Sequence, residues 1–350
     1  MRLIACTLLA MSTAASAQFQ ILNGKTTASL RGIDAVSPQV AWASGSGGTV
    51  LLTTDGGANW KHCAVPTGGE ELDFRGVRSR DEKTALIMAS GTGKSSAIFK
   101  TTDGCATWRL VFANPDADGF FDALAQMKIG SRYRLMGDQV GGRFTVFWSN
   151  DGGETWDRDT QPGLEAVKGA GGFAASNSGF IVPIETKEGN LLEFATSATD
   201  TDPPAVYYNW KSNWVKATVP MPANGGTSGI FSLASDGSSV VAVGGNYPKP
   251  TETAGTAAYS TDLGKSWRAA EMMPSGYRSA VAFDARSKAW IAVGPTGTDV
   301  SHDHGMHWTS LKPSTTDAPD ADKNWNAISL PFVVGSKGKI GKLEPGVLGK

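Results

Sequence analysis

The sequence predicts an all-β fold, a seven-bladed β-propeller built from four-stranded antiparallel blades. The first observation is an eight-residue pattern ending in tryptophan, which the chain repeats roughly every 50 residues. The second is the composition: 43 glycines and 11 tryptophans among 350 residues are typical of many short strands joined by tight turns. The third is a last repeat unit that is too short to hold four strands of its own.

The repeated octets have a local physical logic. Their Asp and the Ser or Thr two residues earlier are side chains that bond nearby backbone amides in tight turns. Glycine at the fifth position accepts a positive φ without steric cost, and the closing Trp needs burial between neighbouring units. Five octets carry both structural residues: Asp55 and Trp60, Asp103 and Trp108, Asp151 and Trp156, Asp262 and Trp267, and Asp303 and Trp308. We interpret Tyr207 to Trp214 as a worn sixth copy.

The N-terminal residues 1–17 are typical of a signal peptide. Arg2 precedes an apolar run, and Ala15-Ser16-Ala17 forms a small-residue cleavage site. We therefore expect an exported protein, periplasmic or extracellular, whose residues 18–350 form one propeller domain. No later stretch approaches the roughly 18 apolar residues of a membrane span. The near balance of 32 Lys and Arg against 33 Asp and Glu excludes a generally basic nucleic-acid-binding surface. We also expect the protein to be a monomer.

The units can be followed along the chain. In the first unit, residues 31–36, 40–44, 49–53 and 60–65 are the four expected strands. The inner strands of successive units are expected to begin near Arg31, Arg75, Asp122, Gly171, Ser228, Arg278 and Asn326. The last unit stops before a fourth strand, and the N-terminal segment Phe19 to Leu22 has no unit of its own. We expect this segment to complete the last blade and close the ring, because closure removes exposed sheet edges.

Two cysteines, Cys63 and Cys105, remain after the signal peptide. Export would permit a disulfide bond between them. They fall on the outer parts of adjacent units, however, and a bridge needs Cα atoms within about 7 Å. The sequence therefore favours two free thiols over a disulfide.

Arginines recur where inner strands begin, at the mouth of the central channel. Arg31, Arg75, Arg278 and Asn326 belong to contiguous blades and are expected to form one arc, with Lys94 and Arg143 on hairpins of the same face. Arginine suits a carboxylate or phosphate because it donates two parallel hydrogen bonds. The alternative is that these arginines form structural ion pairs with acidic neighbours such as Asp34 or Asp122. Both interpretations stay open.

Three further patterns imitate binding motifs without completing them. The histidines of the last octet, from His302 to His307, lie in a solvated turn whose Asp303 is already committed. Residues 114–119 resemble the start of a calcium loop but lack its final Glu and its helices. Residues 91–95 resemble a phosphate loop without its first glycine. We expect no metal and no cofactor.

The octets are identified as Asp-box, or BNR, motifs, which occur in sialidases and in many non-enzymatic propellers. Four longer stretches resemble the exported photosystem II stability/assembly factor propellers: Leu30 to Trp60, Phe74 to Val77, Gly244 to Trp267, and Gly276 to Gly297. The resemblance covers nearly the whole mature chain and implies a binding or assembly role. In the photosynthetic members an Arg-rich surface is thought to contact a membrane-protein subunit, and Arg31, Arg75 and Arg278 are the matching candidates here.

Two functions remain as hypotheses. The favoured one is a non-catalytic binding or assembly propeller that recognises an anionic group of a protein or glycan at the Arg-lined mouth. The alternative is a sialidase-like glycoside hydrolase, which would need a carboxylate pair. Asp122 and Asp138, expected in one blade, are the candidates for that pair. The FRIP-like motif of sialidases is absent.

Overall fold

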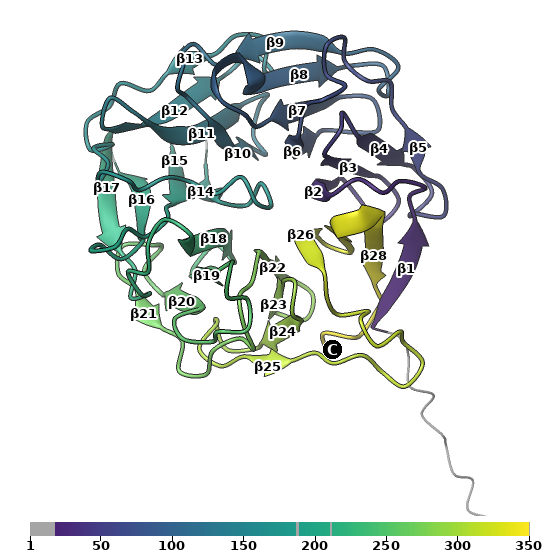
Figure 1. The fold of residues 1–350 in the computed structure, drawn as a ribbon, viewed down its shortest axis with the longest axis vertical. Helices are drawn as coiled ribbons and strands as arrows, with labels where there is room; N and C mark the ends of the chain where they lie inside the picture. Colours follow the sequence, from purple (N-terminus) through teal and green to yellow (C-terminus); the bar gives the residue numbers. More distant parts are fainter. Residues whose placement is uncertain (1–17, 187–188, 211, 350) are drawn as a thin grey trace, which may run out of the picture.

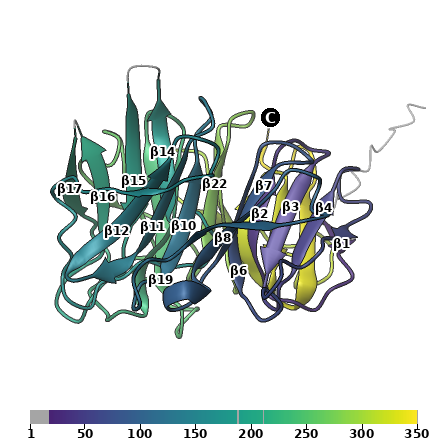
Figure 2. The ribbon, with the colours of Figure 1, turned by 90° about the horizontal axis from the view of Figure 1, so that it is seen from above.

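The computed structural model describes residues 18–186, 189–210 and 212–349. Seven four-stranded antiparallel sheets stand around a common centre as the blades of a propeller (Figure 1). Seen from the side, the strands run between the two faces of the ring (Figure 2). The predicted fold class is therefore confirmed, while the predicted signal peptide, residues 1–17, lies outside the described residues.

The blades follow the order of the chain. Their strands, from the inside outward, are β2 Leu30–Ala35, β3 Ala41–Gly45, β4 Val50–Thr53 and β5 Lys61–His62 in blade 1; β6 Phe74–Ser79, β7 Ala85–Ala89, β8 Ala97–Thr101 and β9 Arg109–Ala113 in blade 2; β10 Phe121–Gln126, β11 Tyr133–Val140, β12 Arg143–Ser149 and β13 Asp157–Arg158 in blade 3; β14 Phe180–Glu185, β15 Asn190–Ala195, β16 Ala205–Trp210 and β17 Asn213–Thr218 in blade 4; β18 Ser228–Ser235, β19 Val240–Asn246, β20 Ala257–Ser260 and β21 Arg268–Ala269 in blade 5; β22 Ala280–Asp284, β23 Ala289–Val293, β24 Thr298–Ser301 and β25 Thr309–Ser310 in blade 6; and β26 Trp325–Ser329, β27 Phe332–Gly335, β28 Lys339–Leu343 and β1 Phe19–Asn23 in blade 7. Two single 3₁₀ turns, η1 Gly93–Ser95 and η2 Ser336–Gly338, interrupt hairpins.

The N-terminal strand closes the ring. β1 pairs antiparallel with β28, in a register that places Phe19 opposite Leu343. Phe19 is buried and its ring lies 5.6 Å from that of Trp325. The expected closure is confirmed, and its cause is the three-stranded last unit, which leaves an apolar edge that only β1 covers.

The hydrophobic core is divided among the interfaces between blades. Each of seven buried clusters joins two adjacent blades, including the pair formed by blades 7 and 1. At that junction the ring of Trp60 meets the edge of Phe332 at 5.9 Å. At the next junction Trp108 meets Trp42 at 6.3 Å. The octet tryptophans thus pack where the sequence predicts, between neighbouring units.

The five octets share one hydrogen-bonding scheme. In the first octet, the Thr53 hydroxyl accepts from the amide of Gly57 (2.9 Å) and donates to Asp55 (2.9 Å). Asp55 in turn accepts from the amide of Asn59 at 2.9 Å. The same three contacts recur in the other four octets. The hydroxyl and the carboxylate therefore replace backbone partners that a turn this tight cannot supply.

The worn copy in blade 4 is not an octet turn. β16 and β17 pair directly, with Trp210 opposite Asn213, so the segment from Tyr207 to Trp214 is a plain β-hairpin. Trp214 lies inside β17 instead of preceding the fourth strand, and its indole donates to Asp159 at 3.0 Å. Without the Asp and its Ser or Thr partner, nothing holds the longer turn, and the interpretation of a sixth copy was wrong.

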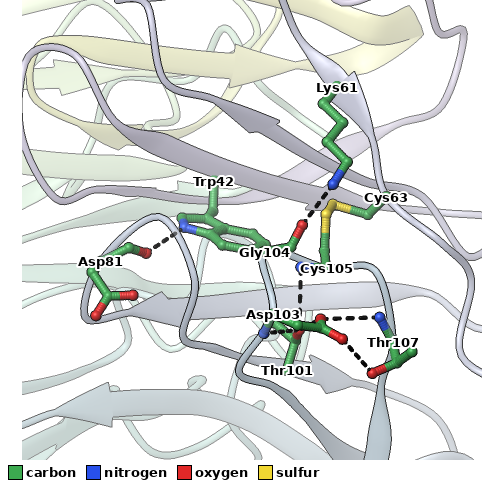
Figure 3. The surroundings of a disulfide bond; sticks show 9 residues. All are labelled: Trp42, Lys61, Cys63, Asp81, Thr101, Asp103, Gly104, Cys105 and Thr107. Atoms are coloured by element: carbon green, nitrogen blue, oxygen red, sulfur yellow. Dashed lines mark hydrogen bonds between the residues drawn. A yellow bond between two sulfur atoms is a disulfide. The ribbon is translucent and has the colours of Figure 1, made fainter.

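Cys63 and Cys105 form a disulfide bond, contrary to the sequence-based expectation. The octet of blade 2 reaches back onto the fourth strand of blade 1, where Lys61 donates to the Gly104 carbonyl (Figure 3). The amide of Ala64 also donates to the Cys105 carbonyl. This contact brings the Cα atoms of the two cysteines to 5.2 Å. Adjacent units therefore touch at their rims as well as at their cores.

Removing this bridge is expected to lower the free energy of unfolding. For a loop closed over 42 residues, the loss is about 2–4 kcal/mol in Cys63→Ala with Cys105→Ala, because the unfolded chain gains freedom. Cys105 has a φ of +62°, so pairing Cys63→Ala with Cys105→Gly is the matched control that relieves the backbone. Urea denaturation measures the free energy of unfolding of the wild type and of both double variants, and thiol titration measures whether the cysteines of the wild type are paired. Equal stability of the oxidised wild type and the Ala variant would contradict the expectation.

Candidate functional site

The inner strands carry a repeated irregularity on one face of the ring. In five blades the pairing between the first and second strands slips by one residue near the start of the inner strand. A bulge of this kind turns the extra side chain away from the regular pleat. The five bulge residues are Arg31, Arg75, Asp122, Phe231 and Asn326. We call the surface around them the mouth.

The segment before β14 fills the channel beneath the mouth. The Asn177 side chain accepts from the amide of Leu124 at 2.7 Å and donates to the carbonyl of Val77, so it joins the inner strands of blades 2 and 3. Its neighbour Ser178 contacts the hydroxyl of Ser232 in blade 5 at 2.7 Å. Figure 1 shows the loop beside β14 reaching toward the middle of the ring. We call residues 170–179 the plug.

The plug corrects one sequence prediction. Gly171 was expected to start the inner strand of blade 4, but that strand begins at Phe180. Apart from Phe173 and Asn177, residues 170–179 are Ala, Gly or Ser, which suits a segment at the narrow axis of the ring. A Cβ on Gly172, for example, would lie 2.6 Å from the Asp122 carboxyl carbon.

Two guanidinium groups lie together at the mouth. Arg31 is half-buried and makes no hydrogen bond or ion pair within the part of the chain that the structure describes. Burial and the neighbouring Arg75 guanidinium lower the pKa of Arg31, while Asp73 and Tyr277 act in the opposite direction. Arg75 is held by Asp73 at 2.7 Å and reaches the plug carbonyl of Ala174. Asp73 is thus the one carboxylate beside the two arginines, and the Arg31 guanidinium has no acceptor among the described residues.

Aromatic rings form the opposite side of the mouth. The plug residue Phe173 stacks on Phe231 with ring centroids 3.7 Å apart. Tyr277 meets the edge of Phe231 at 4.7 Å, and Tyr247 approaches it at 6.3 Å. Burial raises the pKa of Tyr277, and the positive charge of Arg31 opposes that shift, so the aromatic and cationic halves adjoin. Tyr247 is half-exposed, which makes it the most accessible ring of the four.

Asp122 and Asp138 do lie together, but they are covered. Asp122 is 2% exposed and its Oδ2 has no hydrogen-bond partner. Burial and the adjacent Asp138 carboxyl raise the pKa of Asp122, while Arg75 opposes the rise. Asp138 accepts from the plug amide of Gly172 at 2.8 Å. The two carboxyls therefore act on each other beneath the plug, in a place that favours the neutral acid.

Of the remaining candidates, Asn326 occupies a bulge of the mouth, whereas Arg278 is held by a buried partner. Arg278 is fully buried and pairs with Asp299, with Nε 2.6 Å from the carboxylate. Asn326 donates to the Leu30 carbonyl at 2.8 Å and fastens blade 7 to blade 1. Arg143 pairs with Glu165 at 2.7 Å, and Lys94 is exposed on η1. The structural alternative therefore describes Arg75, Arg143 and Arg278, which each have an acidic partner, whereas Arg31 has none among the described residues.

Sequence reasoning missed the aromatic half of the mouth. Phe173, Phe231, Tyr247 and Tyr277 come from a plug, a bulge and two strand ends, and no spacing links them. One signal of the bulges was available in the sequence: Arg31 and Arg75 each precede a glycine. A glycine there leaves room where the bulge brings a neighbouring segment close. Across the described ranges no group of His, Cys, Asp and Glu has the geometry of a metal site, and no helix is long and apolar enough to cross a membrane.

Comparison with known proteins places these features in context. No protein-family model matches the chain. Among curated proteins it is similar to the photosystem II assembly lipoprotein Ycf48 of Synechococcus sp. (strain CC9902), at 24% identity over 163 residues. That match covers 47% of this chain and 46% of the relative, so it spans about half the length of each.

Solved structures resemble the chain over nearly its whole length. YCF48 bound to D1 peptide has a TM-score of 0.61 at 14% identity, covering 94% of this chain and 98% of that one. YCF48 from Cyanidioschyzon merolae gives 0.61 at 19% identity, covering 94% and 99%. This chain therefore shares its propeller fold with both YCF48 structures. A GH74 xyloglucanase from Xanthomonas campestris also matches, with a TM-score of 0.63 at 16% identity over 93% of this chain and 53% of the enzyme.

Proposed function

We propose that this chain is a non-catalytic binding or assembly propeller that holds an anionic group of a protein partner, foremost a peptide carboxylate, at the mouth. The observation that carries the proposal is Arg31, a half-buried guanidinium without an acceptor, beside the second guanidinium of Arg75. A buried cation normally has a partner. A bound carboxylate supplies that partner and relieves the repulsion between the two arginines.

The aromatic side of the mouth favours a peptide over a free ion. Phe173, Phe231, Tyr247 and Tyr277 place flat apolar surface beside the cationic pair. A carboxylate preceded by an apolar or aromatic side chain satisfies both halves at once. The likeness to Ycf48, one solved structure of which is bound to D1 peptide, supports a peptide ligand, because the two share a fold over nearly the whole chain.

The binding of short peptides tests this proposal. We expect a fluorescein-labelled peptide that ends in Phe with a free carboxylate to bind more tightly than its amidated twin. Arg31→Gln should weaken that binding at least tenfold, since a hydrogen bond to a charged group contributes about 1.5–3 kcal/mol. Fluorescence anisotropy measures both effects.

Arg109→Gln is the matched control, because Arg109 is an exposed arginine paired with Glu154 far from the mouth. It should leave peptide affinity unchanged, and neither substitution should alter the thermal unfolding midpoint by more than a few degrees. Equal affinity for the acid and the amide, or an Arg31→Gln variant that binds like the wild type, would exclude the mouth as a carboxylate site.

The sialidase-like alternative has a weaker basis. Asp122 and Asp138 supply two carboxyls, yet Asp122 is nearly inaccessible and Gly172 of the plug lies against it. A general acid must reach the glycosidic oxygen of its substrate. The GH74 likeness concerns the fold only. Release of a chromophore from an aryl glycoside, lost in Asp122→Asn, would reverse this judgement in favour of a hydrolase.

The proposed setting is outside the cytoplasm. The disulfide between Cys63 and Cys105 supports export, because such bonds persist in oxidising compartments. It agrees with the signal peptide predicted for residues 1–17. Fractionation of cells that produce the full chain, with the mature N-terminus determined by mass spectrometry, tests this: processing before Gln18 is the expected result.

A further inference from the structure

The missing octet of blade 4 leaves a notch on the face opposite the mouth. Each octet normally covers the second strand of the blade before it: a Cβ on Gly153 would lie 2.5 Å from Leu86, and one on Gly305 would lie 2.8 Å from Val241. Leu86 and Val241 are the second residues of β7 and β19. The corresponding residue of β11 is Arg134, which no octet covers because blade 4 has only a hairpin.

A groove of about 710 Å³ occupies this notch. Its volume falls in the range of small-molecule sites, roughly 300–1,000 Å³. Arg134 and Trp148 lie next to each other on its floor, since they face each other across the β11–β12 ladder. The walls come from blades 4 and 5: Asn190, Asn209, Trp210 and Lys265.

Two polar groups of the groove are incompletely paired within the described residues, Arg134 and Asn190. The Arg134 guanidinium donates to the carbonyl of its neighbour Tyr133 at 2.8 Å and makes no salt bridge with any described carboxylate. Oδ1 of Asn190 is buried and has no hydrogen-bond partner. Asp159, which also lines the groove and acts electrostatically on Arg134, accepts from the Trp214 indole. The groove therefore combines two cations, Arg134 and Lys265, with the single carboxylate of Asp159, an orphan acceptor and an indole face.

We propose that this groove binds an acidic saccharide, with one hexuronic acid unit seated on Trp148. Arg134 receives the carboxylate in a bidentate contact, and Lys265 adds a second cation at the rim. The apolar C–H face of the pyranose covers the indole. Ring hydroxyls donate to Asn190 Oδ1 and exchange hydrogen bonds with Asn209, whose amide donates at present to Gln161. This site is independent of the mouth.

Binding of trigalacturonate, measured by isothermal titration calorimetry on the full mature chain, tests the proposal. We expect binding in the micromolar to millimolar range. Arg134→Gln and Trp148→Ala should each weaken it at least tenfold, and Arg134→Lys should fall between Arg134→Gln and the wild type because it keeps charge without the planar fork. A neutral galactose trisaccharide should bind at least tenfold more weakly than the acid.

Arg286→Gln is the matched control, because it removes an exposed guanidinium from the turn between β22 and β23 of blade 6 and leaves the groove intact. Trigalacturonate binding must be unchanged in that variant. The proposal is overturned if trigalacturonate does not bind, if the neutral sugar binds equally well, or if Arg31→Gln and not Arg134→Gln abolishes binding. A Trp148→Ala variant that melts well below the wild type is replaced by Trp148→Leu, for which the same loss of affinity is expected.

Discussion

Asp299→Ala will destabilise the protein by about 3–5 kcal/mol, because it leaves the Arg278 guanidinium buried without its counter-ion. Both side chains are at most 1% exposed. Asp299 accepts from Arg278 Nε and from the amide and hydroxyl of Ser275, while Arg278 also donates to the Tyr277 carbonyl and the Thr296 hydroxyl. Denaturant unfolding at neutral pH measures the loss.

Glu165→Ala is the control for this change, since it breaks an ion pair with Arg143 whose two side chains are 38% and 69% exposed. We expect Glu165→Ala to lower the free energy of unfolding by less than about 1 kcal/mol. The double variant Arg278→Met with Asp299→Leu should recover most of the stability, because no lone charge stays buried. If Asp299→Ala costs no more than Glu165→Ala, the pair is not the structural ion pair described above.

The fold was predictable from the sequence because its determinants are local and repeated. An Asp, a hydroxyl and a Trp within eight residues define each turn, and a last unit of three strands predicts closure by β1. The exceptions occur where the repeat changes. The plug has the small residues of a buried segment but no strand partner, and the hairpin of blade 4 keeps the Trp of an octet without its Asp.

The candidate site was predictable only in part. The position of Arg31 and Arg75 at the channel mouth follows from the repeat, but the direction of a side chain does not. Arg278 turns away from the mouth toward Asp299, a residue of β24 that no periodic argument connects to it. The disulfide was missed for a similar reason: contact between the blade 2 octet and blade 1 depends on how blades lean against each other.

Glu193 is an acidic residue at a position that is apolar in other blades. It occupies the part of β15 that the blade 5 octet covers, with a Cβ on Gly264 only 2.8 Å from its carboxyl carbon. Other blades have Leu86, Val241 or Phe332 under their octets. Glu193 is fully buried and neither carboxyl oxygen has a hydrogen-bond partner. Burial, with a smaller effect from Asp262, raises its pKa to about 8.

This pKa makes stability depend on pH with a definite sign. Since the folded-state pKa is raised from 4.5, the folded protein holds a proton that the unfolded chain releases. The contribution of Glu193 is therefore fully present below about pH 4.5 and is lost as the pH rises toward 8. At 1.36 kcal/mol per pH unit, the loss is about 3 kcal/mol at pH 7 and about 5 kcal/mol at pH 9.

Glu193→Leu and Glu193→Gln should remove this pH dependence, and Glu193→Leu should also restore the apolar contact made elsewhere by Leu86 and Val241. The measurement is the free energy of unfolding at pH 5, 7 and 9, taken as the difference between variant and wild type so that other titrating groups cancel. We expect that difference to grow with pH in favour of the variants and to level off above pH 8. Glu70→Gln, at an exposed glutamate, should show no such growth. A Glu193→Leu variant that is less stable than the wild type at pH 9 would mean that the carboxylate has a partner when ionised, and the blade 4–5 interface would then be a charged contact instead of an apolar one.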